Sequence, residues 1–209
     1  MDYWPVERVL RDVRINLIIE GTSEIMHLFI AREALDPHLN RIKPLLSGKV
    51  SIGEKWRAAV KMGMHYALWY PTLWLPALNS YGELTDRRLV LHMQYVDGAS
   101  KKLARFVFHT MMKYQKKLES KQIILNRMVD IGVELFAMAA ACSYADALIK
   151  KDKTKSNAVD LADLYCHTAR ERIQNFFKEN VCNHDRLTLS IARKIMAKEF
   201  EWMEDEIIK

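Results

Sequence analysis

The sequence predicts an all-α fold made of one or more up-and-down helical bundles, and three observations support this. Half of the 209 residues are apolar, which supplies enough material for a core. From residue 83 onward, apolar side chains recur at three- and four-residue intervals, the spacing of one helical face. Short polar connections separate these stretches, and such connections between long amphipathic helices make neighbouring helices antiparallel.

The first predicted element is a short helix from about Trp4 to Val13. Pro5 suits its first turn, where the missing N–H would have no intrahelical partner in any case. The apolar residues that follow have helical spacing: Val6, Val9, Leu10 and Val13. The next run, Ile15 to Ile19, is apolar apart from one asparagine and is too short to form a helix of its own.

A tight turn, Glu20-Gly21, follows this apolar run. Glycine removes the steric penalty of a side chain at the bend. Thr22 or Ser23 can cap the next helix, because their hydroxyl groups accept hydrogen bonds from free N–H groups of the first turn. We expect that helix to end at Leu35, since Asp36-Pro37 is a strong stop signal.

Two interpretations of Glu20 stay open from the residues alone. It is either a solvated loop acid or a carboxylate aimed at a cleft, since four of the five residues before it are large and apolar. Apolar surroundings raise the pKa of a carboxylate and make it a better proton acceptor near neutral pH. The helix start that follows offers N–H groups to an anionic or carbonyl-bearing ligand.

The run from Tyr3 to Leu35, YWPVERVLRDVRINLIIEGTSEIMHLFIAREAL, resembles the carboxyl-terminal signature of the flavin-dependent acyl-CoA dehydrogenases. The shared features are a Pro-Val-Glu helix, an Arg-Asp pair, a Glu-Gly-Thr turn and a helix that ends in Ala-Arg-Glu. The resemblance implies that Glu20 is the catalytic base that removes the α-proton of the acyl thioester. It also implies contacts with the bound substrate and cofactor: Gly21 against the acyl-CoA, and Thr22, Ser23 and Glu24 at the border of the FAD.

Within this family the chain is most similar to the very-long-chain type, which carries an appended helical domain. The resemblance implies a C-terminal fragment of an enzyme for the α,β-dehydrogenation of fatty acyl-CoA in β-oxidation. Its cofactor would be FAD, its substrate fatty acyl-CoA, and its electron acceptor the electron-transfer flavoprotein or a similar protein. The appended bundle would take the space of a second subunit pair, so a homodimer is expected.

The family's amino-terminal helical domain and middle β-domain, which make most of the flavin contacts, have no counterpart before Tyr3. We therefore expect that this chain alone neither retains FAD nor has dehydrogenase activity. The alternative left open is a non-catalytic helical module for protein interaction or membrane docking.

Residues 41–82 are predicted to form a basic, aromatic connector between residues 1–40, which carry the family signature, and an appended bundle, 83–209. Prolines, glycines and small polar residues favour a loop from Asp36 to Gly53. The connector holds six basic residues against one acidic residue, and its stretch from Met62 to Leu78 is rich in Trp and Tyr. It forms either a helical hairpin with buried aromatics or a peripheral contact with a membrane interface.

Four helices are predicted in the appended bundle. They run from Glu83 to Leu118, from Glu119 to Lys150, from a cap at Ser156 or Asn157 to about Asn180, and from Asp185 to Trp202. The residues expected in the core include two pairs: Phe136 and Tyr144, and Leu161 and Leu164.

Composition and residue spacing narrow the function further. A net charge of +6 suits an anionic substrate, an acidic partner or a membrane surface, and does not point to nucleic acid. The three cysteines lack CxxC spacing, so buried thiols in a reducing compartment are expected: Cys142, Cys166 and Cys182. No metal site is predicted, because the histidines of the bundle have no acid or cysteine at ligand spacing: His92, His109, His167 and His184.

No secretory signal opens the chain, and no run of about 18 uncharged apolar residues could span a bilayer. We expect a cytoplasmic protein. Peripheral contact with the inner face of a membrane, through residues 41–82, is the alternative that stays open.

Overall fold

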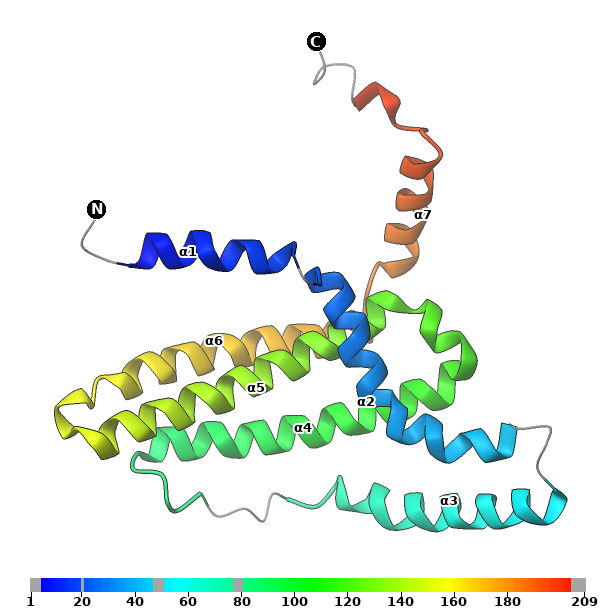
Figure 1. Ribbon diagram of the computed structural model, residues 1–209, viewed down its shortest axis with the longest axis horizontal. Coiled ribbons are helices and arrows are strands. Elements are labelled where there is room, and N and C mark those ends of the chain that lie inside the picture. The colour runs from blue at the N-terminus through cyan, green and yellow to red at the C-terminus, as the bar shows by residue number, and fades with distance from the viewer. Residues whose placement is uncertain (1–4, 20, 47–50, 77–80, 204–209) are drawn as a thin grey trace.

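The computed structural model describes residues 5–19, 21–46, 51–76 and 81–203, and these residues form helices without a β-strand (Figure 1). The α-helices are α1 Val6–Arg14, α2 Ser23–Leu46, α3 Ile52–Thr72, α4 Arg87–Tyr114, α5 Gln122–Lys151, α6 Ala158–Glu179 and α7 Asp185–Met196. Short 3-10 helices lie at Ile15–Leu17, Gln115–Ser120, Lys153–Lys155 and Glu201–Met203. The all-α prediction is confirmed.

An antiparallel bundle of α4, α5 and α6 forms the body of the molecule (Figure 1). Its core consists of apolar side chains that point inward from all three helices, and the largest of those fully buried are Leu89, Ile131, Met138, Ile173 and Val159. Helix α5 is the central element, since it packs against α4, against α6 and against α2.

Helix α2 crosses the bundle and docks on α5 through a second apolar cluster. Ala31 and Leu35 of α2 are buried there among Leu118 of the 3-10 helix Gln115–Ser120 and three residues of α5: Leu125, Met128 and Val129. Helix α3 lies beside α2 and begins with a capping box, in which the Ser51 hydroxyl accepts from the Glu54 N–H and the Glu54 carboxylate accepts from the Ser51 N–H.

The prediction that a helix ends at Leu35 is wrong. The loop expected over Asp36 to Gly53 is wrong for residues 36–46 and 52–53, which are helical, while residues 47–50 lie outside the described residues. Helix α2 continues through Pro37 and Pro44 to Leu46. A proline lacks the N–H that would donate to the carbonyl four residues earlier, which for Pro37 is the carbonyl of Glu33. Pro37 and Glu33 are both exposed, so water can donate to that carbonyl instead. The burial of Leu35 and the hydrogen bond from the Arg41 guanidinium to the Pro37 carbonyl (2.7 Å) hold the chain helical on both sides.

The helix bounds predicted for residues 83–180 agree with α4, α5 and α6 to within a few residues. The last helix is shorter than predicted: α7 ends at Met196, and Lys198 has a φ of +63°. Four side chains expected in the core are instead exposed: Phe136, Tyr144, Leu161 and Leu164. The α6 residues that face the core are Val159, Ala162, Cys166, Ala169, Ile173 and Phe177, so Leu161 and Leu164 lie on the opposite side of that helix.

Two of the three cysteines are buried as predicted. The thiols of Cys142 and Cys166 lie 3.6 Å apart in the bundle core, whereas Cys182 is exposed just after α6 and departs from the prediction.

Helix α7 extends away from the bundle (Figure 1) and is fixed at its first residue, where the Arg127 guanidinium donates to both carboxylate oxygens of Asp185 (2.9 and 2.6 Å).

Candidate functional site

The turn that the sequence marks as the candidate site lies immediately before α2. Glu20, the predicted base, lies outside the residues that the structure describes. Gly21 has a φ of +117°, a conformation that side-chain-bearing residues rarely adopt, and a Cβ placed there would lie 3.0 Å from the Met26 sulfur. The turn therefore requires glycine at this position.

Thr22, Ser23 and Glu24 form the amino end of α2. The Thr22 hydroxyl accepts a hydrogen bond from the Ile25 N–H (3.4 Å), and the Thr22 carbonyl accepts the Met26 N–H (2.9 Å). The first N–H groups of a helix lack intrahelical partners and carry the positive end of its dipole. This end of α2 can thus donate to an anionic or carbonyl-bearing ligand.

His27 fixes the first turn of α2 to the bundle. Its Nδ1 lies 2.5 Å from the Ser23 carbonyl, and its Nε2 lies 2.8 Å from Oδ1 of Asp130 on α5. Both partners are acceptors, so both ring nitrogens must donate, which requires the doubly protonated ring. Burial lowers the pKa of His27, but the hydrogen bonds to Ser23 and Asp130 and the charges of Asp130 and Glu24 together raise it above its ordinary value.

Sequence reasoning missed this link. His27 and Asp130 are 103 residues apart, each sits within an ordinary helical pattern, and only the packing of α2 on α5 brings them together. The one local signal that could have suggested a polar contact is Asp130 itself, a carboxylate within a mainly apolar stretch of α5.

The residues on both sides of the turn expose an unusual amount of apolar surface. None of α1 is buried, and twelve large apolar side chains between Val6 and Ile30 are each exposed by 42–70%. They are Val6, Val9, Leu10, Val13, Ile15, Leu17, Ile18, Ile19, Ile25, Met26, Phe29 and Ile30. Exposed apolar surface in this amount marks an interaction site.

Residues 62–72 of the aromatic stretch form the second half of α3, and the aromatic rings of the connector divide between two environments. Tyr66, Trp69 and Tyr70 are half-buried in a ring cluster with Phe108 of α4, where Tyr66 and Phe108 have ring centroids 5.2 Å apart. Trp56 and Trp74 are exposed by 71% and 64%. The expected hairpin with buried aromatics is therefore only partly realised, and membrane contact stays a prediction.

A shallow hollow of about 420 Å³ lies between α2, α4 and α5, lined mainly by small and apolar residues that include Ala34, Leu103, Gly132 and Leu135. No residue of the turn 21–24 lines it.

No helix in the described part of the chain combines the length and the hydropathy needed to cross a membrane.

Three side chains that the sequence did not connect meet between α4 and α6. His92 Nε2 lies 2.7 Å and His167 Nε2 lies 3.5 Å from Oδ1 of Asp163. Asp163 and His167 are one helical turn apart, whereas His92 is 71 residues from Asp163 in the sequence. The sequence-based view that these histidines have no acidic partner is wrong. The four-residue spacing of Asp163 and His167 on one helix was a signal that could have been used, whereas the contact of His92 joins two helices and leaves no trace in local spacing.

Two family models match the chain. One, described as the C-terminal domain of ACAD9/ACADV, matches residues 88–200, and the other, described as the acyl-CoA dehydrogenase C-terminal domain, matches residues 1–35. The two matches cover the bundle and the candidate turn respectively, and leave the region of α3 between them.

The chain is also similar to individual proteins. It is 39% identical over 210 residues to a probable acyl-CoA dehydrogenase, FadE10, of Mycobacterium tuberculosis (98% of this chain, 32% of that protein). It is 28% identical over 179 residues to the human mitochondrial very long-chain specific acyl-CoA dehydrogenase (81% and 26%). A crystal structure of an acyl-CoA dehydrogenase complexed with FAD from Bacillus anthracis superposes with a TM-score of 0.57 at 27% identity (92% and 30%). The chain thus spans about a quarter to a third of the length of these relatives.

Proposed function

Because the chain belongs to the acyl-CoA dehydrogenase family, in the branch with the ACAD9/ACADV C-terminal domain, we propose that it acts as the C-terminal part of an FAD-dependent acyl-CoA dehydrogenase. The whole enzyme would introduce the α,β double bond into fatty acyl-CoA during β-oxidation. The bundle of α4–α6 is then the appended domain, and the segment up to Leu35 is the end of the catalytic body.

The observation that carries this proposal is the exposed apolar surface between Val6 and Ile30. A helix with an apolar face gains its stability by burying that face, yet nothing in the described part of the chain covers α1. The same segment lies within the residues that match the acyl-CoA dehydrogenase C-terminal domain. The preceding part of the enzyme is the natural cover, since the relatives are about three times as long as this chain.

The chemistry assigned to the turn follows from its residue types and position. Glu20 takes the α-proton of the acyl thioester as the catalytic base. Gly21 places no side chain between the backbone of the turn and the acyl-CoA, so the two can approach closely. FAD, when bound, accepts the hydride from the β-carbon.

The described residues fit one border of an FAD site and no more. The amino end of α2 offers N–H donors from Thr22, Ser23 and Glu24 to a polar part of the cofactor. A cofactor of that size needs walls on most sides, and the turn supplies one. We therefore infer that this chain retains no flavin by itself and is inactive alone.

The partners follow from the same proposal. The substrate is fatty acyl-CoA, and the electrons pass on to an electron-transfer flavoprotein or a similar acceptor. A homodimer is expected, with the appended bundle in the place of a second subunit pair. Trp56, between Lys55 and Arg57 on α3, and Trp74, whose ring lies under the Arg105 guanidinium (4.3 Å), are both exposed and support peripheral contact with a membrane as an additional role.

Reconstitution tests the proposal directly. The chain is produced together with the part of the Mycobacterium tuberculosis relative that precedes the aligned region, and the purified complex is examined for flavin absorbance and for bleaching by acyl-CoA. Yellow complex that is bleached by acyl-CoA is expected, with no flavin on either part alone. If the two parts co-purify without flavin, or do not co-purify, a non-catalytic helical module is the better description.

A further inference from the structure

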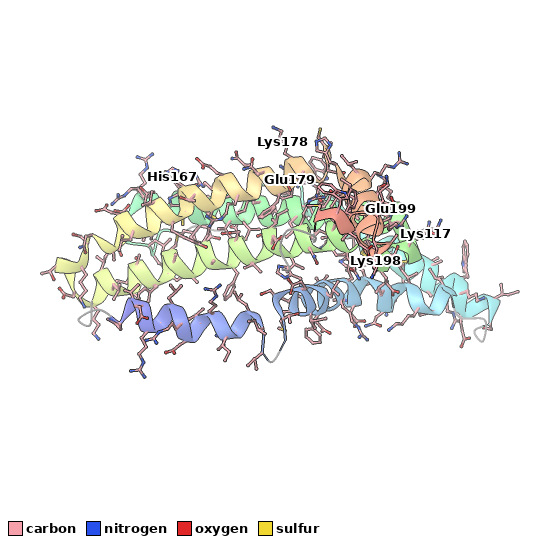
Figure 2. The ribbon with its side chains drawn as sticks, turned by 90° about the horizontal axis from the view of Figure 1, so that it is seen from above. Lys117, His167, Lys178, Glu179, Lys198 and Glu199 are labelled. Carbon is pink, nitrogen blue, oxygen red and sulfur yellow. The ribbon has the colours of Figure 1, made fainter. Side chains whose placement is uncertain are left out.

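His92, Asp163 and His167 form a cluster of ligand-type side chains that the proposed dehydrogenase function does not use. One nitrogen or oxygen atom from each lies within 4.8 Å of the others. His92 is 2% exposed, Asp163 is half-buried and the side chain of His167 is 63% exposed, so the cluster opens from the bundle core to solvent. Figure 2 shows His167 on the outer side of α6.

The fold holds these groups rigidly. Asp163 and His167 are four residues apart on α6 and therefore project from the same face of that helix. His92 comes from the neighbouring α4, whose core residues pack against α6 on the same side of the bundle. Two ligands on one helical turn and a third on an adjacent packed helix define a fixed, three-point arrangement.

Charge around the cluster favours a cation. Three carboxylates gather there, from Asp86, Asp160 and Asp163, and the Arg88 guanidinium lies 3.2, 2.8 and 3.8 Å from them. Arg170, the other cation nearby on α6, instead lies over the Tyr95 ring (4.4 Å). The three carboxylates carry one more negative charge than the guanidinium groups of Arg88 and Arg170 can balance.

The buried ring of His92 has unused capacity. Its Nε2 contacts Asp163, but its Nδ1 has no hydrogen-bond partner in the described part of the chain. Polar atoms buried to this degree are normally satisfied by protein, water or an ion. Because Nδ1 is free of other partners among the described residues, it can carry the ring proton while Nε2, which faces Asp163, binds a metal ion.

We propose that His92, Asp163 and His167 bind a divalent transition-metal ion of the Zn²⁺ type, which joins α4 to α6. Zn²⁺ takes imidazole nitrogen at about 2.0–2.1 Å and carboxylate oxygen at about 2.0–2.2 Å, which places tetrahedral ligand atoms about 3.3 Å apart. The present separations lie on both sides of that value, so small side-chain rotations complete the site. Water fills the fourth position on the exposed side.

Ligand chemistry selects the metal class. Two imidazoles and one carboxylate suit Zn²⁺, Co²⁺ or Ni²⁺, whereas Ca²⁺ and Mg²⁺ require mainly oxygen ligands. Metal binding at His92 Nε2 displaces the proton that this nitrogen donates to Asp163, and the proton moves to Nδ1, so the ring stays neutral as it coordinates the ion. The inference is independent of the dehydrogenase proposal, because it rests on residues remote from the turn.

Isothermal titration of ZnCl₂ into the full chain tests the site, with Cys182→Ser as the background because Cys182, His184 and Asp185 offer a second set of ligands near one another in sequence. One equivalent of Zn²⁺ should bind and raise the melting temperature. His167→Ala should weaken binding by about tenfold or more. The matched control, His184→Ala, removes another exposed histidine and should leave binding unchanged.

Two measurements separate this site from adventitious binding. Co²⁺ in place of Zn²⁺ should give a tetrahedral spectrum without thiolate charge transfer, and Asp163→Asn should weaken binding as His167→Ala does. His92 is left unchanged because substitution of a buried residue could unfold the bundle. Absence of binding in the background protein, equal affinity in His167→Ala, or a thiolate band would each overturn the proposal.

Discussion

The segment from Val6 to Ile30 and the bundle of α4–α6 are both rich in apolar residues, but the bundle buries them and the segment leaves them exposed. In the bundle, Leu89, Ile131 and Ile173 are completely buried. In the first segment, every large apolar residue of α1 stays more than half exposed. The helices of the bundle therefore serve as packing partners for one another, whereas the apolar side chains of the first segment need a surface that other residues supply.

The largest expected effect concerns the chemistry of the first segment. In the reconstituted complex, Glu20→Gln should keep bound flavin but lower turnover by about a hundredfold or more, because an amide cannot accept the α-proton. Steady-state oxidation of acyl-CoA measures turnover, and flavin absorbance measures assembly. Unchanged turnover would remove Glu20 from the mechanism. Loss of flavin in this variant would indicate a structural role instead.

A matched pair of leucines tests the comparison itself. In the isolated chain, Leu89→Ala should lower the free energy of unfolding by about 2–5 kcal/mol, because it opens a cavity in the core of the bundle. Leu10→Ala, at a residue that is 69% exposed, should change it by less than about 0.5 kcal/mol. Urea titrations followed by circular dichroism measure both. Equal losses would mean that α1 packs on the bundle in solution.

The same contrast explains how far the sequence could predict this structure. Helical periodicity defined α4, α5 and α6 because their stability comes from repeating faces that pack on one another. It misplaced Leu161 and Leu164, since an apolar residue on the outer face fits the same pattern until a neighbour is known. The predicted end of α2 came too early, because the stop signal at Pro37 is a local preference, and the packing of Leu35 overrides it.

The candidate site shows the same limit. The turn and the roles implied for its residues could be proposed from the sequence, since they lie within one continuous motif. The contacts of His27 with Asp130 and of His92 with Asp163 could not, because they join residues 103 and 71 positions apart. A periodic pattern says which face of a helix is apolar, but not which helix lies opposite.

Exposed tryptophans outside the first segment allow the comparison to be extended to α3 and the residues after it. If Trp56 and Trp74 enter a membrane interface, replacement of both by alanine should weaken binding to anionic phosphatidylglycerol vesicles by about tenfold, since burial of two such side chains exceeds 1.4 kcal/mol. Trp69→Ala is the control, because Trp69 is half-buried in the ring cluster. Vesicle flotation measures binding. Equal flotation of the double variant and the parent would exclude the membrane role.

The smallest expected effect lies where the two regions join, at the ion pair between His27 and Asp130. Its side chains are 26% and 34% exposed, so the pair is worth about 0.2–1 kcal/mol. Because the pKa of His27 is raised in the folded protein, this stabilisation is fully present below the unfolded value of about 6.5 and is lost as the pH rises through the folded pKa.

Asp130→Asn should therefore lower stability at pH 6, flatten its pH dependence above that value, and speed amide exchange in the first turn of α2, where the His27 ring binds the Ser23 carbonyl. Asp12→Asn, which changes an exposed carboxylate of α1, is the matched control and should leave these amides unaffected. Amide exchange followed by NMR resolves residues 23–27 individually. Exchange rates identical to those of the parent chain would mean that the packing of Ala31 and Leu35 alone fixes the start of α2, and that the appended bundle does not hold the turn through this ion pair.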